Sequence, residues 1–215
     1  MEIVFRHPVA GDRGVSRTGP SFLGHPLFAW LGLRPVHAQH TEEEGHALQR
    51  WASGRRSLVE IGVAEGASAL ALRKVMHTGG VLYLIDPFHL SRIPLVNSVR
   101  RVARQTVNRS SNGQVEWVEQ FSCLAAKTWR VSIDFLFLDG DHSYQAVQQD
   151  WLDWSPFLPA QGIVAFHDAR TFHGGWTSSD DGPVMFVDRG FRNGRLTGWE
   201  IIEEVHSMVI VRRSA

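Results

Sequence analysis

Residues 58–68 constrain the fold of this chain more than any other stretch, because they combine a short apolar run, two glycines and a helix start. The run Leu58–Ile61 is typical of a strand that is buried on both faces of a parallel sheet. Gly62 and Gly66 follow it, and residues 67–76 have the composition of a helix. This order leaves backbone N–H groups unpaired at the helix start, where a ligand can approach closely. The stretch therefore predicts a parallel sheet with a ligand site at a strand end.

Strand-like and helix-like segments alternate along the rest of the chain. Further strands are predicted at residues 81–85, 115–118, 133–138 and 162–166, and helices at 95–107, 122–129, 143–154 and 183–191. A helix over residues 41–53 precedes them, and Thr41 with Glu44 fits a capping box at its start. Residues 199–205 and 208–211 are expected to pair as a closing antiparallel hairpin. The order indicates an α/β fold with a Rossmann-like doubly wound sheet, mostly parallel with an antiparallel C-terminal strand, and helices on both faces.

The first 38 residues differ in composition from the rest. They hold five glycines and four prolines, which argue against regular structure over most of this length. We therefore divide the chain into an irregular N-terminal arm or lid at 1–38 and a ligand-binding domain at 39–215. Large apolar side chains in the arm, such as Phe22, Phe28 and Trp30, need burial. They pack on their own domain, cover a substrate or form a dimer contact, and these alternatives remain open.

Overall composition excludes some classes of partner. Lysine plus arginine and aspartate plus glutamate both total 22, so the net charge is zero and neither nucleic acid nor a membrane surface is expected as a partner. No long apolar span or signal peptide is visible, so a cytoplasmic location is expected. Cys123 is the single cysteine, which rules out a disulfide within this sequence, and its apolar neighbours predict a buried thiol.

Polar residues follow the carboxyl ends of the predicted strands, which is where ligands bind in open parallel sheets. In chain order these residues are Asp86, Ser122, Asp139, Gly140, Asp141, His142, His167 and Asp168. Asp86 is suited to accept hydrogen bonds from both hydroxyls of a ribose, or it forms a turn before Pro87. Ser122 either contacts an adenine edge or caps the following helix. Their convergence on one edge predicts a binding site for a nucleotide-like ligand.

Two motifs resemble those of a known enzyme class. The spacing Glu60-x-Gly62-x-x-x-Gly66 is similar to the first motif of class I S-adenosylmethionine (SAM) methyltransferases. The run Asp-Gly-Asp-His-Ser-Tyr at 139–144, with a later His-Asp pair, resembles small bacterial members related to macrocin O-methyltransferases and to the cephalosporin-hydroxylase group. The likeness spans roughly residues 41–213. Because Ala64 replaces the middle glycine of the dinucleotide fingerprint, a nicotinamide dehydrogenase is disfavoured.

The resemblance implies that SAM is the cofactor. The residues expected to contact it are Glu60, Gly62 and Gly66 at the methionine end, Asp86 at the ribose, Ser122 near the adenine, and also Ser68 and Asp139. Relatives that bind Mg2+ use acids that correspond here to Asp139 and Asp168, with position 167 completing the site. His167 replaces a common acid, so Mn2+ or a similar ion would suit the set better than Mg2+. A metal-free site is the alternative.

The implied function is O-methylation of a hydroxyl on a small molecule, such as a sugar or a secondary metabolite, by in-line transfer. The catalytic candidates are His142 and His167 as bases, with Asp139 assisting. The segment His173–Trp176 either forms part of the acceptor pocket or is a disordered loop, and both alternatives remain open. A hydroxylase-like protein and a non-catalytic SAM-binding protein of the same fold are the alternatives. The expected partners are the small-molecule methyl acceptor and a second copy of the chain in a homodimer.

Overall fold

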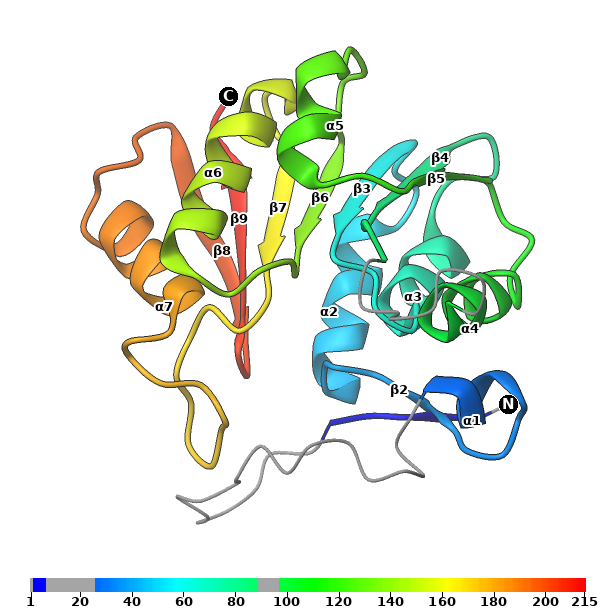
Figure 1. Cartoon of the computed structure of the whole chain (residues 1–215). Helices are drawn as coiled ribbons and strands as arrows, with labels where there is room; N and C mark the ends of the chain where they lie inside the picture. Colours follow the sequence, from blue (N-terminus) through cyan, green and yellow to red (C-terminus); the bar gives the residue numbers. More distant parts are fainter. Residues whose placement is uncertain (1, 7–25, 89–96) are drawn as a thin grey trace.

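The computed structural model describes residues 2–6, 26–88 and 97–215. Its main sheet has the order β5-β4-β3-β6-β7-β9-β8. The strands are β3 (Ser57–Ile61), β4 (Val81–Ile85), β5 (Gln114–Val118), β6 (Phe135–Leu138), β7 (Ile163–Phe166), β8 (Trp199–Val205) and β9 (Met208–Arg213). Strands β3 to β7 pair in parallel, whereas β9 is antiparallel to β7 and to β8. The predicted doubly wound sheet is therefore confirmed (Figure 1).

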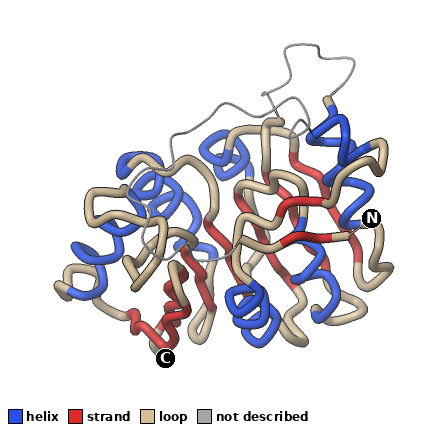
Figure 2. The backbone as a smooth tube through the Cα atoms, turned by 90° about the horizontal axis from the view of Figure 1, so that it is seen from below, coloured by secondary structure: helices blue, strands red, loops and turns tan. Residues whose placement is uncertain are grey.

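Helices cover both faces of this sheet because the strand side chains alternate between them. On β3, Leu58 packs into the cluster formed with α2 (Glu42–Ala52), α3 (Ala67–Val75) and α4 (Ser98–Val107). The next residue, Val59, packs into the cluster with α5 (Ser122–Thr128), α6 (Tyr144–Trp154) and α7 (Gly182–Val187). Figure 2 shows the strands in a row with helices on either side.

The remaining elements are short. A 3-10 turn η3 (Ser155–Phe157) follows α6, and a π-helical turn η4 (Asp188–Arg192) follows α7. The predicted helix at 183–191 is thus divided between α7 and η4. The capping box at Thr41 is confirmed, since the Glu44 amide donates to its hydroxyl at 3.2 Å and the Thr41 amide donates to the Glu44 carboxylate at 2.8 Å.

The described part of the N-terminal arm packs on the domain. Strand β1 (Ile3–Val4) pairs in parallel with β2 (Val36–His37), and α1 (Pro26–Trp30) lies against α4. Ala29 and Val36 are fully buried, in a cluster with Ala67 of α3 and Val102 of α4. The apolar side chain of Phe22 lies outside the described residues. The division of the chain at residue 38 stays a prediction.

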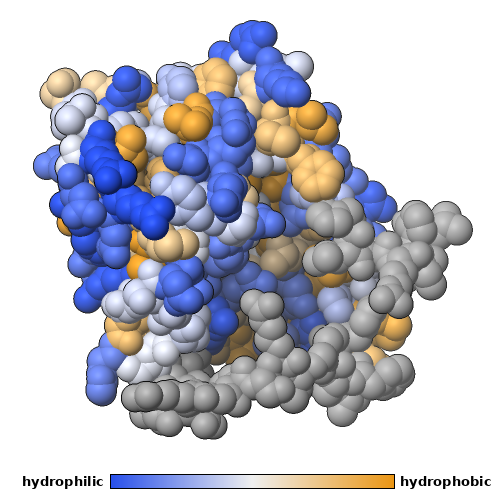
Figure 3. Space-filling view, turned by 60° about the vertical axis from the view of Figure 1, so that its left-hand side comes forward, coloured by the Kyte–Doolittle hydropathy of each residue, from blue (hydrophilic) through white to orange (hydrophobic). Residues whose placement is uncertain are grey.

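The surface corrects one expectation. Cys123 is exposed, so the prediction of a buried thiol is wrong. The reason is that α5 buries only Ala125 completely, and Cys123 lies on the outer side of this short helix. On the face shown in Figure 3, hydrophobic residues are scattered among hydrophilic ones. Among the described helices, none has the length and apolar character needed to cross a bilayer.

Candidate active site

The glycine turn lies where the strand order reverses, between β3 and β6. Gly62 has a φ of +86°, and a Cβ on it would lie 2.0 Å from the backbone oxygen of Asp139. No side chain fits between the two strand ends, which explains the glycine. Gly66, with φ +81°, is the N-cap of α3 and supplies no side-chain hydrogen bond to the helix. Ala64 between them also has a positive φ, +47°, a conformation that favours glycine.

A buried acid lies below this turn. Glu60 at the end of β3 is fully buried, and the Ser68 hydroxyl donates to its Oε1 at 2.5 Å. Its Oε2 has no hydrogen-bond partner among the described residues. Burial raises the pKa of Glu60 well above its usual value. The raised pKa favours the protonated carboxyl, so this oxygen can donate or accept, and an unpaired buried polar atom is costly, so the site fits a ligand with a polar group here.

Asp86, at the end of β4, holds the glycine turn. Its Oδ2 accepts hydrogen bonds from the backbone N–H groups of Val63 at 2.9 Å and Ala64 at 3.3 Å. Its Oδ1 accepts from the Phe88 amide at 2.7 Å. The carboxylate therefore links the end of β4 to the turn after β3, at the edge where the ribose was expected.

Ser122 does not cap α5. The N-cap of α5 is Phe121, which makes no side-chain cap, so the capping alternative for Ser122 is wrong. The Ser122 hydroxyl instead donates to Asp150 of α6 at 2.5 Å. Burial raises the pKa of Asp150 to about 6, against the effect of this hydrogen bond. The pair fixes the loop after β5 to α6.

Acids and histidines from the ends of β6 and β7 meet as expected, because these strands are neighbours in the sheet. Nδ1 of His167 lies 3.0 Å from Asp139 Oδ1. Nε2 of His142 lies 3.2 Å from Asp168 Oδ2 and 3.9 Å from Asp139 Oδ1. The hydrogen bond with Asp168 raises the pKa of His142. The four side chains form one ionic cluster, which we call the strand-end cluster.

His167 lies between two carboxylates. Its side chain is 1% exposed, and its Nε2 lies 3.7 Å from Oε2 of the fully buried Glu44. Burial opposes a charge on the ring, but Asp139 and Glu44 outweigh burial and raise the pKa of His167 well above its usual value. Burial likewise opposes the charge of Glu44, but His167 lowers the pKa of Glu44 to about 2. The pair is therefore charged, and Ser207 completes it by donating two hydrogen bonds to Glu44.

Residues from distant segments reach Asp168. The indole N–H of Trp176 donates to its Oδ1 at 2.5 Å, and the Arg6 guanidinium lies 3.6 Å from its Oδ2. Arg6 also stacks over Trp176, at 4.3 Å from the ring centroid. Trp176 thus lies at the site, whereas His173 is exposed. Sequence reasoning missed Arg6, because no local pattern signals a contact between a terminal segment and a strand end.

Sequence reasoning also assigned Glu44 only a capping role. The spacing between Glu44 and Thr41 was fully explained by a capping box. The sequence did not show where the helix of Glu44 lies relative to His167. The one available signal was its position in a helix that precedes the first core strand. In the structure Glu44 lies against the strand-end cluster, through its contact with His167.

Three of these side chains have the geometry of a metal site. Ligand atoms of Asp139, His142 and His167 lie within 4.8 Å of one another. Two imidazoles and one carboxylate suit Mn2+ or Zn2+ better than Mg2+. The expected ligand Asp168 lies outside this set, as a partner of His142 and Trp176.

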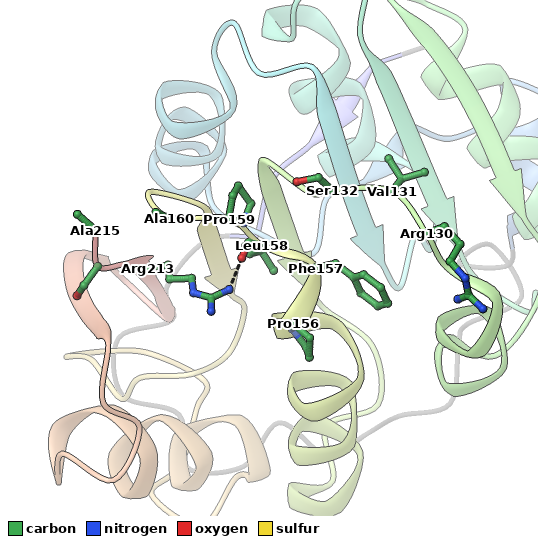
Figure 4. A pocket seen from close by; sticks show the side chains of 11 residues that line it. Arg130, Val131, Ser132, Pro156, Phe157, Leu158, Pro159, Ala160, Arg213 and Ala215 are labelled. Carbon is green, nitrogen blue, oxygen red and sulfur yellow. Dashed lines mark hydrogen bonds between the residues drawn. The ribbon is translucent and has the colours of Figure 1, made fainter.

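A hollow lies at the opposite edge of the sheet from the strand-end cluster, before β6 and β7. Its volume is about 690 Å³, and Arg130, Phe157 and Arg213 are among the side chains that line it (Figure 4). The guanidinium of Arg213 donates to the Leu158 carbonyl beside it. Since the strand-end cluster follows β6 and β7, this hollow is separate from it.

The sheet order with its antiparallel last strand, and the glycine turn at the point of reversal, define the fold of class I methyltransferases. A family model described as a methyltransferase domain matches residues 59–169, more than half of the chain. The chain belongs to this family and is a SAM-dependent methyltransferase.

Several solved structures share the fold at low identity. TomG, an O-methyltransferase from Streptomyces achromogenes solved with SAM, is 15% identical over 88% of each chain, with a TM-score of 0.63. An O-methyltransferase from Bacillus cereus solved with S-adenosylhomocysteine (SAH) is 16% identical over 87% of this chain and 88% of that chain, with a TM-score of 0.62. The O-methyltransferase NovP is 15% identical over 89% of each chain, with a TM-score of 0.62.

Proposed function

We propose that this protein methylates a hydroxyl group of a small molecule, with His142 as the general base. The observation that carries this proposal is the Asp168–His142 pair at the end of β7 and in the loop after β6. The His142 side chain is 45% exposed, whereas Asp168 is 12% exposed and fixed by Trp176. A buried carboxylate that orients a more accessible imidazole is an arrangement suited to proton abstraction.

His142 and Asp168 carry the proton transfer in this proposal, and the strand ends position the reactants. When bound, SAM supplies a methyl group on a sulfonium sulfur, which is a good leaving group. His142 donates its Nε2–H to Asp168, which leaves Nδ1 of the neutral ring to take the proton of the acceptor hydroxyl. The strand ends would hold the acceptor oxygen in line with the methyl group, which SAM would give up by breaking its sulfur–carbon bond and leaving as SAH.

His167 has a different role in this proposal. Its ring is buried and enclosed by Asp139 and Glu44, so it stays protonated and has no access to an acceptor. We propose that its positive charge neutralises Asp139 and Glu44 and that its ring orients the carboxylate of Asp139. Of the two histidines that the sequence offered as the general base, we therefore propose His142.

A small hydroxyl-bearing acceptor agrees with two further observations. The net charge of zero offers no field for a polyanionic nucleic acid. The names of TomG, NovP and the Bacillus cereus protein describe them as O-methyltransferases. For SAM itself we propose Glu60 and Ser68 at the amino-acid end and Asp86 at the ribose.

A labelled-methyl assay tests this function. Purified protein is incubated with methyl-tritiated SAM and a low-molecular-weight metabolite fraction, and the labelled product is tested for the atom that carries the methyl. We expect an O-methyl ether, formed by the wild type and not by heat-treated protein. Label on nitrogen, on protein or on nucleic acid would contradict the proposal.

A metal-assisted reaction is the second candidate, and the three converging ligand atoms favour it. An ion held by Asp139, His142 and His167 would lower the pKa of the acceptor hydroxyl. We favour the metal-free version because His167 already supplies a positive charge between the acids. The same assay after exhaustive chelation is expected to retain full activity. Loss of activity that Mn2+ restores would instead establish the metal-assisted reaction.

A further inference from the structure

The segment from Arg34 to His40 lies directly against the cofactor turn. Glu65, between Ala64 and Gly66 in this turn, accepts hydrogen bonds from both terminal nitrogens of the Arg34 guanidinium, with Nη1 at 3.0 Å. The backbone N–H of His37 donates to the same carboxylate at 3.0 Å. One carboxylate of the turn is thus fixed at three points by a segment about thirty residues earlier in the chain.

This ion pair is unusual in its burial. The side chains of Arg34 and Glu65 are 10% and 11% exposed, whereas those of Arg212 and Glu200 are 35% and 51% exposed. Removing two charges from water is costly, and a buried pair is therefore weak evidence of added stability. A bidentate guanidinium does fix geometry strongly, in both distance and direction. The pair therefore holds the segment from Arg34 to His40 in a fixed position on the turn.

The segment forms one side of a small hollow above the turn, with a volume of about 10 Å³. Its lining includes His37, Gln39 and His40 on one side and Gly66, Ser68 and Asp139 on the other. Figure 1 shows the chain after β2 leading directly into α2 beside the strand ends. The hollow adjoins the start of α3, where Gly66 provides no side-chain cap.

Two unpaired buried polar atoms belong to this region. His40 is 3% exposed, and its Nδ1 lies 2.8 Å from the Thr41 carbonyl, so Nδ1 carries a proton. Its Nε2 has no hydrogen-bond partner among the described residues, and the same is true of Glu60 Oε2 behind Ser68. Burial lowers the pKa of His40, which keeps Nε2 an acceptor. The unpaired Nε2 of His40 on one side and the helix-start N–H donors on the other suit a group with an ammonium and a carboxylate.

We infer that residues 34–40 form the outer wall of the pocket for the amino-acid end of SAM, and that Arg34 is a positioning residue that holds this wall on the cofactor turn through Glu65. The inference rests on the proposed cofactor site. His40 faces the bound amino acid, whereas Arg34 acts through Glu65 and does not touch the ligand. The adenosine end, placed near Asp86, has no contact with this wall.

Two ligands separate this role from a general structural one. SAH carries the amino-acid end, and 5′-methylthioadenosine has the same nucleoside and sulfur without it. Calorimetric titrations of both ligands are made with the wild type, Arg34→Ala, Glu65→Ala and the double variant. Arg212→Ala is the control, because it removes an arginine from an ion pair on the outer strand pair β8–β9.

We expect Arg34→Ala and Glu65→Ala each to weaken SAH binding by about ten- to a hundredfold, with 5′-methylthioadenosine changed less than about twofold. The double variant should resemble Glu65→Ala, because that substitution already removes the Arg34 contact together with the His37 hydrogen bond. Arg34→Lys keeps the charge but not the bidentate geometry, and an intermediate loss is expected while the fold is retained. Arg212→Ala should leave both affinities unchanged.

Equal weakening of both ligands by folded Arg34→Lys would overturn the inference, because a wall of the amino-acid pocket cannot affect a ligand that lacks that end. Unchanged SAH binding in Arg34→Lys and Glu65→Ala would overturn it as well. Failure of the wild type to bind either ligand would overturn the proposed cofactor site, and the inference with it. These three results are distinguishable in one set of titrations.

Discussion

Replacement of His142 by alanine is expected to lower kcat by about a hundredfold to ten-thousandfold, which is the usual contribution of a positioned general base. The affinity for SAH should stay unchanged, because His142 faces the acceptor in the proposed arrangement. His46→Ala is the matched control, since this exposed histidine lies on α2. Steady-state kinetics and SAH titration measure the two quantities. A His142→Ala protein with wild-type kcat would contradict the assignment of the base.

The raised pKa of His142 also predicts how kcat depends on pH. The hydrogen bond with Asp168 raises the pKa of His142 above 6.5, and the base must be neutral to act. Activity is therefore low below this raised pKa and increases as the pH rises through it. Asp168→Asn removes the negative partner, so the acidic limb of the profile should move to lower pH while kcat falls. An acidic limb that does not move would show that another group controls it.

The second large effect concerns stability. Glu44→Gln is expected to lower the free energy of unfolding at pH 7 by on the order of 3 kcal/mol, which follows from the depressed pKa of Glu44. Its physical cause is the loss of the carboxylate that faces the buried His167. The control is Glu42→Gln in the same helical turn, an exposed residue for which we expect a change within about 0.5 kcal/mol. Urea unfolding measures both variants.

The sign of the pH effect distinguishes this charge from simple packing. The pKa of Glu44 falls from 4.5 in the unfolded chain to about 2 in the folded protein. Its stabilisation is therefore fully present above about pH 4.5 and is lost as the pH falls toward 2. The difference between wild type and Glu44→Gln should shrink over that window. A difference that stays constant down to pH 3 would mean that the charge of Glu44 is not its cause.

Local patterns predicted most of the fold. The apolar run at β3, the glycines at 62 and 66 and the capping box at Thr41 each depend on neighbours within a few residues, so the sequence carries their signals directly. Parallel strands place their carboxyl ends on one edge, and this rule alone brought Asp139 and Asp168 together. Gln161 illustrates the same locality, since it has a φ of +65° in the turn before Gly162, a conformation that favours glycine.

Long-range contacts were not predictable in this way. The contacts of Glu44 with His167 and of Arg6 with Asp168 depend on how separate elements pack, and no spacing in the sequence encodes them. The same holds for Arg34 and Glu65. For Cys123, apolar neighbours suggested burial, but burial depends on which side of α5 meets the sheet. The site therefore combines a predictable strand edge with supports that only the folded structure reveals.

The central claim is that the turn after β3 and Asp86 form a pocket for SAM. Calorimetric titration of the purified protein with SAM, SAH and NAD tests it most directly. We expect micromolar binding of SAM and SAH and no binding of NAD. Asp86→Ala should weaken SAM binding by about 1.5–3 kcal/mol, because the ribose and the turn lose a charged acceptor. Clear binding of NAD without any heat from SAM would contradict the claim.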